Sequence, residues 1–409
     1  MKFKMKNLLI FIFIYVTLFS QAQSFVQNDK TSIDGRDINT VTTAVPFLMI
    51  APDSRSGSMG DVGVATTPDP NSQHWNPAKY SFTKNEMGFS VSYTPWLRAL
   101  IPDINLAYLA GYKKIDERQS VSASLLYFSI GDITFTNDKG DVMGQFSPNE
   151  FAIDAAYSRL FGDNISGAIA LRYINSNLTG GIEVGGAVSH PGQSVAADVS
   201  SYYQKDIKLS GKESTVAFGI NFSNVGAKIS YTENADKDFI PMNLRLGGAL
   251  TTQLDNYNSM MITADLNKLL VPTPPVYYNT NDTAGEGGAP IVQFGKDPNV
   301  SVPTGLFQSF YDAPAGGKEE LREITYSVGL EYWYAKQFAL RGGYFYEHAT
   351  KGNRKFFTLG LGLRLNVFGL DFAYLIPTAQ KHPLENTLRF TLTFDFEGFK
   401  KQAGETPVN

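Results

Sequence analysis

The chain's most regular feature is an alternation of apolar and polar residues that recurs over most of its length. From Thr387 to Phe396, every second residue is large and apolar, and Arg389 and Asp395 are among the polar residues between them. A period of two predicts a β-strand with one apolar face. The run has the length of about 9–11 residues that a tilted membrane-crossing strand needs, whereas strands of soluble sheets usually have about 5–6. A long edge strand of a soluble sheet remains the alternative for one such segment alone.

Other segments repeat the pattern and fix which residues face outward. Apolar residues fill the odd positions from Phe357 to Val367, and the phase then slips by one at Phe368. A strand cannot change phase without exposing its apolar face, so a tight turn is expected near 366–369. Arginine at the outward Leu361 or Leu392 should cost about 2–4 kcal/mol. Arginine at the inward Thr358 or Thr391 is expected to be milder.

The whole pattern predicts an all-β fold, a transmembrane antiparallel β-barrel of about fourteen strands, an even number as in bacterial barrels. The first seven strands are expected at 86–94, 104–112, 119–130, 149–159, 164–174, 212–222 and 225–232. The second seven are expected at 239–250, 257–266, 322–334, 336–346, 354–366, 368–376 and 387–397.

The connections between these strands alternate in length. The longer ones, including 175–211 and 267–321, all follow odd-numbered strands, as expected when long extracellular loops alternate with short periplasmic turns. Loops of this length are uncommon inside soluble domains. The alternation predicts that both termini lie in the periplasm.

The segments outside the alternating region predict export and a separate lead-in. Lysines precede an apolar run from Leu8 to Phe19, and Ser20-Gln21-Ala22 suits a cleavage site, so residues 1–22 are expected to be a secretory signal peptide. The run is short for an uncleaved membrane anchor. Residues 23–85 are rich in glycine and proline and are expected to form a periplasmic or plug segment, with a disordered linker as the alternative. The barrel would span 86–397, and 398–409 would be a periplasmic tail.

Composition narrows the class further. The chain is 43% apolar, which excludes global disorder, and its 21 tyrosines, 29 phenylalanines and 37 glycines suit aromatic girdles and a crowded barrel interior. A net charge of −4 without a basic block beyond the N-terminus argues against nucleic-acid binding. There is no cysteine, which excludes disulfides and lipid attachment through an N-terminal cysteine.

Motifs for catalysis or cofactors are absent from the sequence. The four histidines, His74, His190, His348 and His382, lie in expected loops or in the lead-in without a second ligand at metal spacing. No G-x-S-x-G nucleophile motif and no phosphate-binding loop occurs. We therefore expect no enzyme activity, no metal and no cofactor.

Charged residues on the inward faces of the strands are candidates for the barrel lumen. Asp154 and Asp265 belong to this set, together with Arg172, Arg245, Glu331, Arg341, Arg364, Asp371, Arg389 and Asp395. Opposite charges on neighbouring strands can pair and fill an interior, so a packed polar core is the preferred interpretation over an open channel.

Apolar residues in the expected extracellular loops are candidates for partner binding. They are Trp96, Leu97, Leu100, Ile101, Tyr277, Tyr278, Phe307 and Phe310. Exposed apolar residues at this density usually pack on one another or on a partner. Trp96 could instead belong to an aromatic girdle at the membrane interface.

Several motifs resemble a known family. The segments 47–55 (FLMIAPDSR), 59–66 (MGDVGVAT), 75–79 (WNPAK) and 93–97 (YTPWL) look like the N-terminal signature of the PorV (LptO) family, outer-membrane barrels of the Bacteroidetes type IX secretion system that are themselves similar to FadL transporters. The resemblance implies a non-enzymatic barrel. Its partners would be the type IX translocon, secreted cargo with C-terminal signal domains, a sortase-like cell-surface attachment complex and outer-membrane lipid. The alternative is a FadL-like channel for hydrophobic small molecules.

Overall fold

The computed structural model describes residues 38–98, 101, 103–136, 139–178, 180–181, 183–184, 187–232, 237–277, 291–379 and 382–396. Every element below lies within the compact unit Thr40–Asn409. The expected signal peptide and the tail 398–409 lie outside the described residues.

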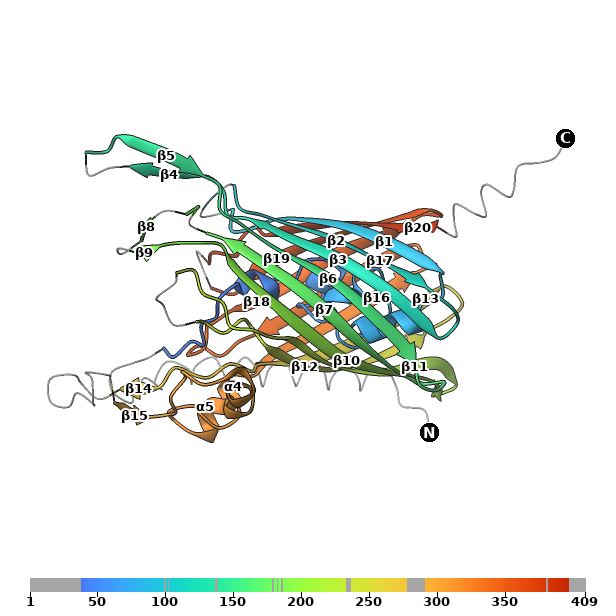
Figure 1. Ribbon diagram of the computed structural model, residues 1–409. Coiled ribbons are helices and arrows are strands. Elements are labelled where there is room, and N and C mark those ends of the chain that lie inside the picture. The colour runs from blue at the N-terminus through green and yellow to red at the C-terminus, as the bar shows by residue number, and fades with distance from the viewer. Residues whose placement is uncertain are drawn as a thin grey trace. The chain divides into compact units, whose positions relative to one another are not determined.

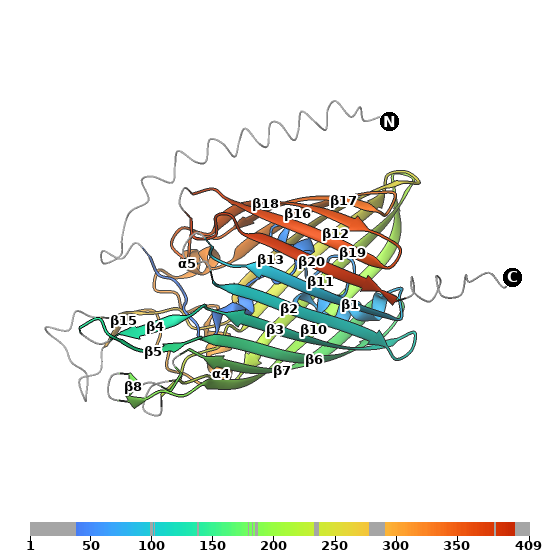
Figure 2. The ribbon, with the colours of Figure 1, turned by 90° about the horizontal axis from the view of Figure 1, so that it is seen from above.

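Fourteen antiparallel strands close a barrel within the described part of the chain, which confirms the predicted fold class (Figures 1 and 2). In spatial order they are β1 (Met87–Pro95), β2 (Asn105–Lys114), β3 (Gln119–Ser129), β6 (Asn149–Leu160), β7 (Ile165–Asn177), β10 (Gly192–Leu209), β11 (Lys212–Gly226), β12 (Asn243–Gln253), β13 (Asn258–Leu269), β16 (Thr325–Tyr334), β17 (Phe338–Tyr346), β18 (Lys355–Arg364), β19 (Phe368–Pro377) and β20 (Leu388–Asp395). The last strand pairs with the first, Phe394 opposite Phe89, so the sheet has no free edge.

The predicted number of strands is right, but one strand was missed and one was wrongly assigned, so the two errors cancel in the count. The supposed loop 175–211 contains the long strand β10, and the supposed strand 225–232 is mostly loop. β10 was missed because its outward face includes Ala197 and Ser201, which weaken the apolar signal. Residues 227–232 alternate, yet Ile229 is buried in an apolar cluster with residues of the interior. The strand at 212–222 is therefore the seventh, not the sixth, and runs opposite to the expected direction.

Side chains alternate between the two faces of the wall as expected for a barrel in lipid. On β18, Leu361 is 59% exposed and Thr358 is 1% exposed, which confirms the predicted phase. Phe357, Leu359 and Phe390 point outward in the same way. The outward face is thus an apolar band, which suits contact with hydrocarbon.

The two ends of the barrel differ in their connections. One end, here named the loop end, bears three two-stranded sheets, β4 (Ile133–Thr136) with β5 (Val142–Phe146), β8 (Glu183–Val184) with β9 (Ala187–Val188), and β14 (Val276–Tyr277) with β15 (Val292–Phe294). The same end bears α4 (Val302–Gln308) and α5 (Gly317–Arg322), as both views show (Figures 1 and 2). The other end, named the turn end, has short connections such as 161–164 and 210–211.

The interior segment is the part of the lead-in from Ala44 to Thr83. It contains the short 3-10 helices η2 (Pro46–Met49) and η3 (Pro77–Phe82) and the single-turn helices α2 (Ser54–Gly57) and α3 (Ser72–Trp75), and it runs inside the barrel (Figure 1, blue). Most of its residues are buried, including Phe47, Met59 and Trp75. Among the described helices, none has the length and apolar character needed to cross a membrane.

Candidate functional site

The first part of the candidate site is the charged wall, the inward face of β16 to β20. Glu331 of β16 accepts hydrogen bonds from two guanidinium groups. Arg55 of the interior segment donates from Nε and Nη2 at 2.9 and 2.8 Å, and Arg341 of β17 donates from Nε at 2.7 Å. Arg55 also reaches Asp69 at 2.9 Å. All four side chains are largely buried, so this network ties the interior segment to the wall by paired charges that water does not screen.

The network continues along the same wall. Asp371 accepts from Arg341 Nη1 and from Arg364 Nη2, both at 2.7 Å. Arg389 donates from Nη1 to the carbonyl of Gly57 at 3.2 Å and to Asp61 at 3.1 Å. These inward positions were candidate lumen residues, and the structure brings them together through the interior segment. The side chain of Asp395, also a candidate, lies outside the described residues.

Threonines on the charged wall bind the backbone of the interior segment. Thr391 Oγ1 accepts from the Ser54 amide and Thr358 Oγ1 accepts from the Gly60 amide, both at 2.8 Å. Arginine at either position would collide with this backbone. From these contacts we expect arginine at these threonines to be at least as damaging as arginine at the outward leucines, which differs from the expectation drawn from the sequence.

Glycines of the wall allow the interior segment to approach closely. A Cβ added to Gly343 of β17 would clash with the Met59 backbone, and one added to Gly329 of β16 would lie 2.6 Å from the Met59 Cβ. A Cβ on Gly360 of β18 would clash with Ser58. Residues 58–60 thus pack directly on the wall at these three glycines, where a Cβ would meet their backbone or side-chain atoms.

A second anchor lies on β12 and β13. Asp265 accepts from the amides of Gly63 and Val64 at 2.7 and 3.0 Å. Arg245 donates to Asn267 at 2.7 Å, and its guanidinium lies 4.6 Å from the ring centre of Trp75.

The apolar wall, the inward face of β2, β3, β6, β7 and β10, holds the interior segment in a different way. Phe47 stacks on Phe128 of β3 with ring centres 6.2 Å apart, and it is buried with Val45 and Leu48 in one apolar cluster. The wall contributes Leu106, Tyr108, Ala110, Leu126, Ala152, Ile174 and Ala196 to this cluster.

A cluster of buried charges around Arg172 interrupts the apolar wall. Arg172 of β7 donates to Asp154 at 2.6 Å and to Asp198 at 3.2 Å, and it also bonds Asn224. Its charge is thus matched by two buried carboxylates. These ion pairs join the neighbouring strands β6, β7 and β10 on the inward face of the wall.

The second part of the candidate site is the loop 270–324 at the loop end. Lys268, at the end of β13, donates to Glu320 at 3.0 Å and to Glu323 at 2.5 Å. Lys351, from the loop 347–354, donates to Glu319 at 2.6 Å and to Glu323 at 3.0 Å. These pairs fix α5 to the rim of the barrel.

Asp312 belongs to the same cluster of charges. Its carboxylate accepts from the Thr273 amide at 3.1 Å. The pKa of Asp312 is raised to about 6, chiefly because burial disfavours the charged form and also because Glu320 and Glu323 lie nearby, whereas the Thr273 hydrogen bonds lower it. Within the described ranges, no histidine and carboxylate side chains gather in a group that could hold a metal ion.

The predicted partner-binding residues have different environments. Phe307 is 68% exposed on α4, and Phe310 and Ile101 are also exposed. Tyr277 is half-buried in β14. Trp96 and Leu97 are half-buried against Phe345, Phe356, Leu375 and Leu384 at the inner side of the rim, so they present less free surface than α4. Leu100 and Tyr278 lie outside the described residues.

The sequence analysis missed the role of Arg55, Asp69 and Lys268. Arg55 pairs with Asp69 of the same lead-in and with Glu331 of the barrel, and no local pattern in the sequence pointed to either pair. Lys268 lies where a strand was expected to have ended, so nothing in the pattern linked it to glutamates some fifty residues later.

Comparison with known proteins supplies the family. A family model described as type IX secretion system protein PorV matches residues 33–276. Solved structures that resemble the chain include the toluene transporter TodX from Pseudomonas putida, with 11% identity, a TM-score of 0.45, and coverage of 88% of this chain and 98% of that one. Another is a FadL homologue from Pseudomonas aeruginosa, with 12% identity, a TM-score of 0.41, and coverage of 88% and 99%. Curated proteins gave no match.

The family match covers more than half of the chain, including the interior segment and the first nine strands of the barrel. It confirms the resemblance found in the motifs, and it is a family of secretion components, not of enzymes. Together with the closed barrel and its apolar outer band, it shows that the chain is an outer-membrane β-barrel that belongs to the PorV family of the type IX secretion system.

Proposed function

We propose that this barrel receives secreted cargo from the type IX translocon, through the cargo's C-terminal signal domain, and brings it to the cell-surface attachment complex. The cargo binds at the loop end, which faces the outside of the cell, and both termini are periplasmic. The family match supports the part of the proposal that concerns the type IX secretion system. The packing of the barrel interior and the build of the loop end support the part that places cargo binding on the outer surface.

The observation that carries the proposal is the occupied interior. The interior segment is fixed by Glu331, Asp265 and the threonines on one side and by the apolar cluster on the other. Removing it would leave several buried charges without partners, which is costly. A barrel built in this way supports binding on its surface better than conduction through its lumen.

The binding surface we propose is the outer side of α4 and the residues that follow it. Phe307, Phe310 and Tyr311 are exposed there, and Lys268 lies 5.9 Å from the ring centre of Phe310. Large aromatic side chains bury much area at low entropic cost and often anchor interfaces. The lysine–glutamate pairs below hold α5 in place, so the aromatic residues stand on a rigid support.

The experiment is to replace Phe307 and Phe310 together by serine in the full chain and to measure co-purification of cargo bearing its C-terminal domain. We expect cargo to be lost while barrel abundance and heat-modifiable migration stay normal. Ile115→Ser is the matched control, because Ile115 is also exposed but lies at the turn end. Normal co-purification with the double variant would remove α4 from the binding surface.

A gene deletion tests the alternative channel function. The proposal expects unprocessed cargo to accumulate while uptake of hydrophobic small molecules stays normal. The reverse result would overturn it. We also propose that the mature protein starts at Gln23, after a cleaved signal peptide, which sequencing of the mature N-terminus will check.

A further inference from the structure

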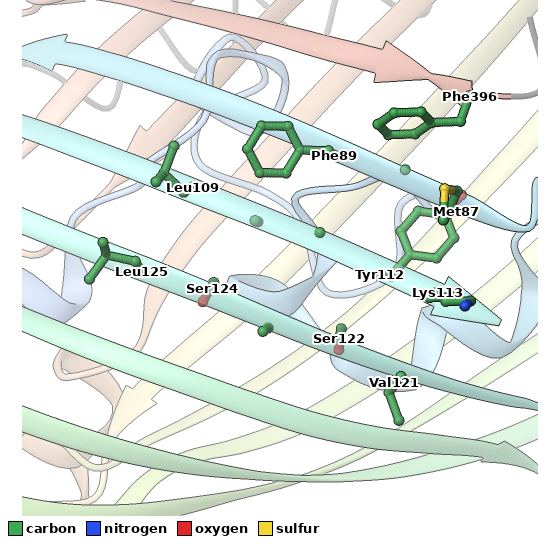
Figure 3. A pocket seen from close by; sticks show the side chains of 14 residues that line it. Met87, Phe89, Leu109, Tyr112, Lys113, Val121, Ser122, Ser124, Leu125 and Phe396 are labelled. Carbon is green, nitrogen blue, oxygen red and sulfur yellow. The ribbon is translucent and has the colours of Figure 1, made fainter. Parts of the chain in front are cut away.

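A groove runs along the outer surface of the barrel near the turn end. It has a volume of about 740 Å³ and crosses β1, β2 and β3 next to the end of β20 (Figure 3). Its outward lining is almost wholly apolar and includes Met87, Phe89, Leu109, Val121, Leu125 and Phe396. The volume lies within the range of about 300–1,000 Å³ of small-molecule sites.

The groove exists because small residues replace large ones at one level of the wall. Gly111 of β2 lies directly opposite Ala123 of β3, and Ala123 lies directly opposite Ala155 of β6. The next outward level toward the loop end carries Leu109 and Leu125. The small residues Gly111 and Ala123 therefore form the floor of the groove, and Leu109 and Leu125 form one of its sides. The surrounding outward surface is covered by large apolar side chains.

One charge lies at the end of this groove. Lys113 is exposed on β2, and Figure 3 shows it beside Met87 at the turn-end side. Among the described residues that line the groove, it is the one charged side chain, and none carries a carboxylate. The site thus pairs an apolar groove with a single cation at its turn-end side.

We propose that this groove binds one phospholipid, with an acyl chain lying over Gly111 and Ala123 and the phosphate against Lys113. An acyl chain fits a narrow apolar groove that already faces hydrocarbon, and the cation complements the phosphate. The short turns place this end toward the periplasm in the orientation proposed above, where the outer membrane's leaflet consists of phospholipid. The inference rests on that orientation for the leaflet, but not on cargo binding.

The experiment fills the groove. Full-length protein, purified in detergent and stripped of lipid, is titrated with phosphatidylglycerol and the first bound lipid is counted by native mass spectrometry. We expect Ala123→Leu to bind it roughly tenfold more weakly, the loss expected when about two buried methylenes are displaced. Ala264→Leu is the matched control, since Ala264 is an exposed outward alanine on β13 that also faces a glycine, Gly248.

A second variant tests the headgroup. Wild-type protein should prefer phosphatidylglycerol over diacylglycerol, which lacks the phosphate, by roughly fivefold, the worth of one lysine near an anionic surface. Lys113→Gln should abolish this preference and keep the binding of diacylglycerol. Equal phosphatidylglycerol affinity for wild type and Ala123→Leu, or equal losses in Ala123→Leu and Ala264→Leu, would overturn the site. Loss of a co-purifying membrane protein in Ala123→Leu without loss of lipid would also overturn it, in favour of a protein partner.

Discussion

The charged wall and the apolar wall hold the same interior segment by different means. On the charged wall, Glu331 bonds Arg55, and Thr391 bonds the backbone of Ser54. On the apolar wall, Phe47 packs on Phe128 and its neighbours by apolar contact. Nearer the turn end of the same strands, Ser122 donates to Gln73 and Ser166 donates to the carbonyl of Ala78, both at 2.6 Å. Directional bonds fix position and register, whereas apolar burial supplies stabilisation that depends little on exact alignment. The comparison indicates that the charged wall positions the part of the segment around residues 54–61, whereas the apolar cluster stabilises the part around residues 44–48.

The largest effect should come from breaking the charged wall. Glu331→Gln leaves Arg55 and Arg341 buried with one charge partner fewer each, which should cost about 3–5 kcal/mol. Limited proteolysis of the interior segment at rising urea concentration will measure the change. Glu385→Gln, at an exposed acid, is the control and should change little. Equal protease resistance of the two variants would show that the charged wall does not fix the segment.

A substitution in the apolar wall should destabilise the interior segment less than the loss of Glu331. Ile174→Ala removes a fully buried side chain of β7 and should cost about 2–4 kcal/mol through lost burial and the cavity left behind. We expect the same proteolysis assay to show earlier opening around residues 44–50, with the contacts of α2 retained. Opening of both halves together would show that the two walls act as one unit.

A pair of adjacent glycines on β17 sharpens the comparison. Gly343→Ala places a Cβ against the Met59 backbone and should cost about 1–3 kcal/mol by overpacking. Gly342→Ala points outward, where the nearest atom would lie 3.8 Å away, and should be neutral. The urea midpoint for protection of the interior segment measures both. Similar midpoints for the two variants would contradict the close packing of Met59 on the charged wall.

The smallest effect concerns Asp312 at the loop end, outside both walls. Its folded-state pKa of about 6 is above the ordinary value of 3.8, so its ionised form is disfavoured in the folded loop. This contribution to stability is present at low pH and is lost as the pH rises from about 4 through about 6. Asp312→Asn should therefore slow amide exchange in the loop at about pH 8 and have little effect at about pH 4. A constant difference across this range would assign the effect to lost hydrogen bonding.

The sequence predicted the barrel well where outward residues are large. β18 and β20 carry Phe or Leu at nearly every outward position, so their length and phase could be read from the pattern. β10 was missed because Ala197 and Ser201 dilute its outward face. The segment 227–232 was wrongly predicted as a strand because its apolar and polar residues alternate. Ile229 is apolar because it packs in the apolar cluster inside the rim, and this produces the same alternation as a lipid-facing strand.

The candidate site was less predictable than the fold. The period of two identified Arg341 and Arg389 as inward residues, because the face on which a residue lies can be read from a single strand. The partners of these residues depend on the path of the interior segment, which has no period. Nothing in the local sequence could show that Arg55 would meet Glu331, or that Gly343 would face Met59. The exposure of Phe307 and the partial burial of Trp96 likewise depend on how loops fold over the rim.

The hydrogen bond between Ser54 and Thr391 joins residues 337 positions apart, at opposite ends of the barrel sequence. The interior segment is made first, but the wall that positions it is made last, so during synthesis and export it has no native partners on that side. Such distant contacts form late in folding. Joining β1 to β20 and seating the interior segment must then be nearly one event. The chain must reach the membrane with this segment still free, and insertion has to gather it in as the last strand arrives.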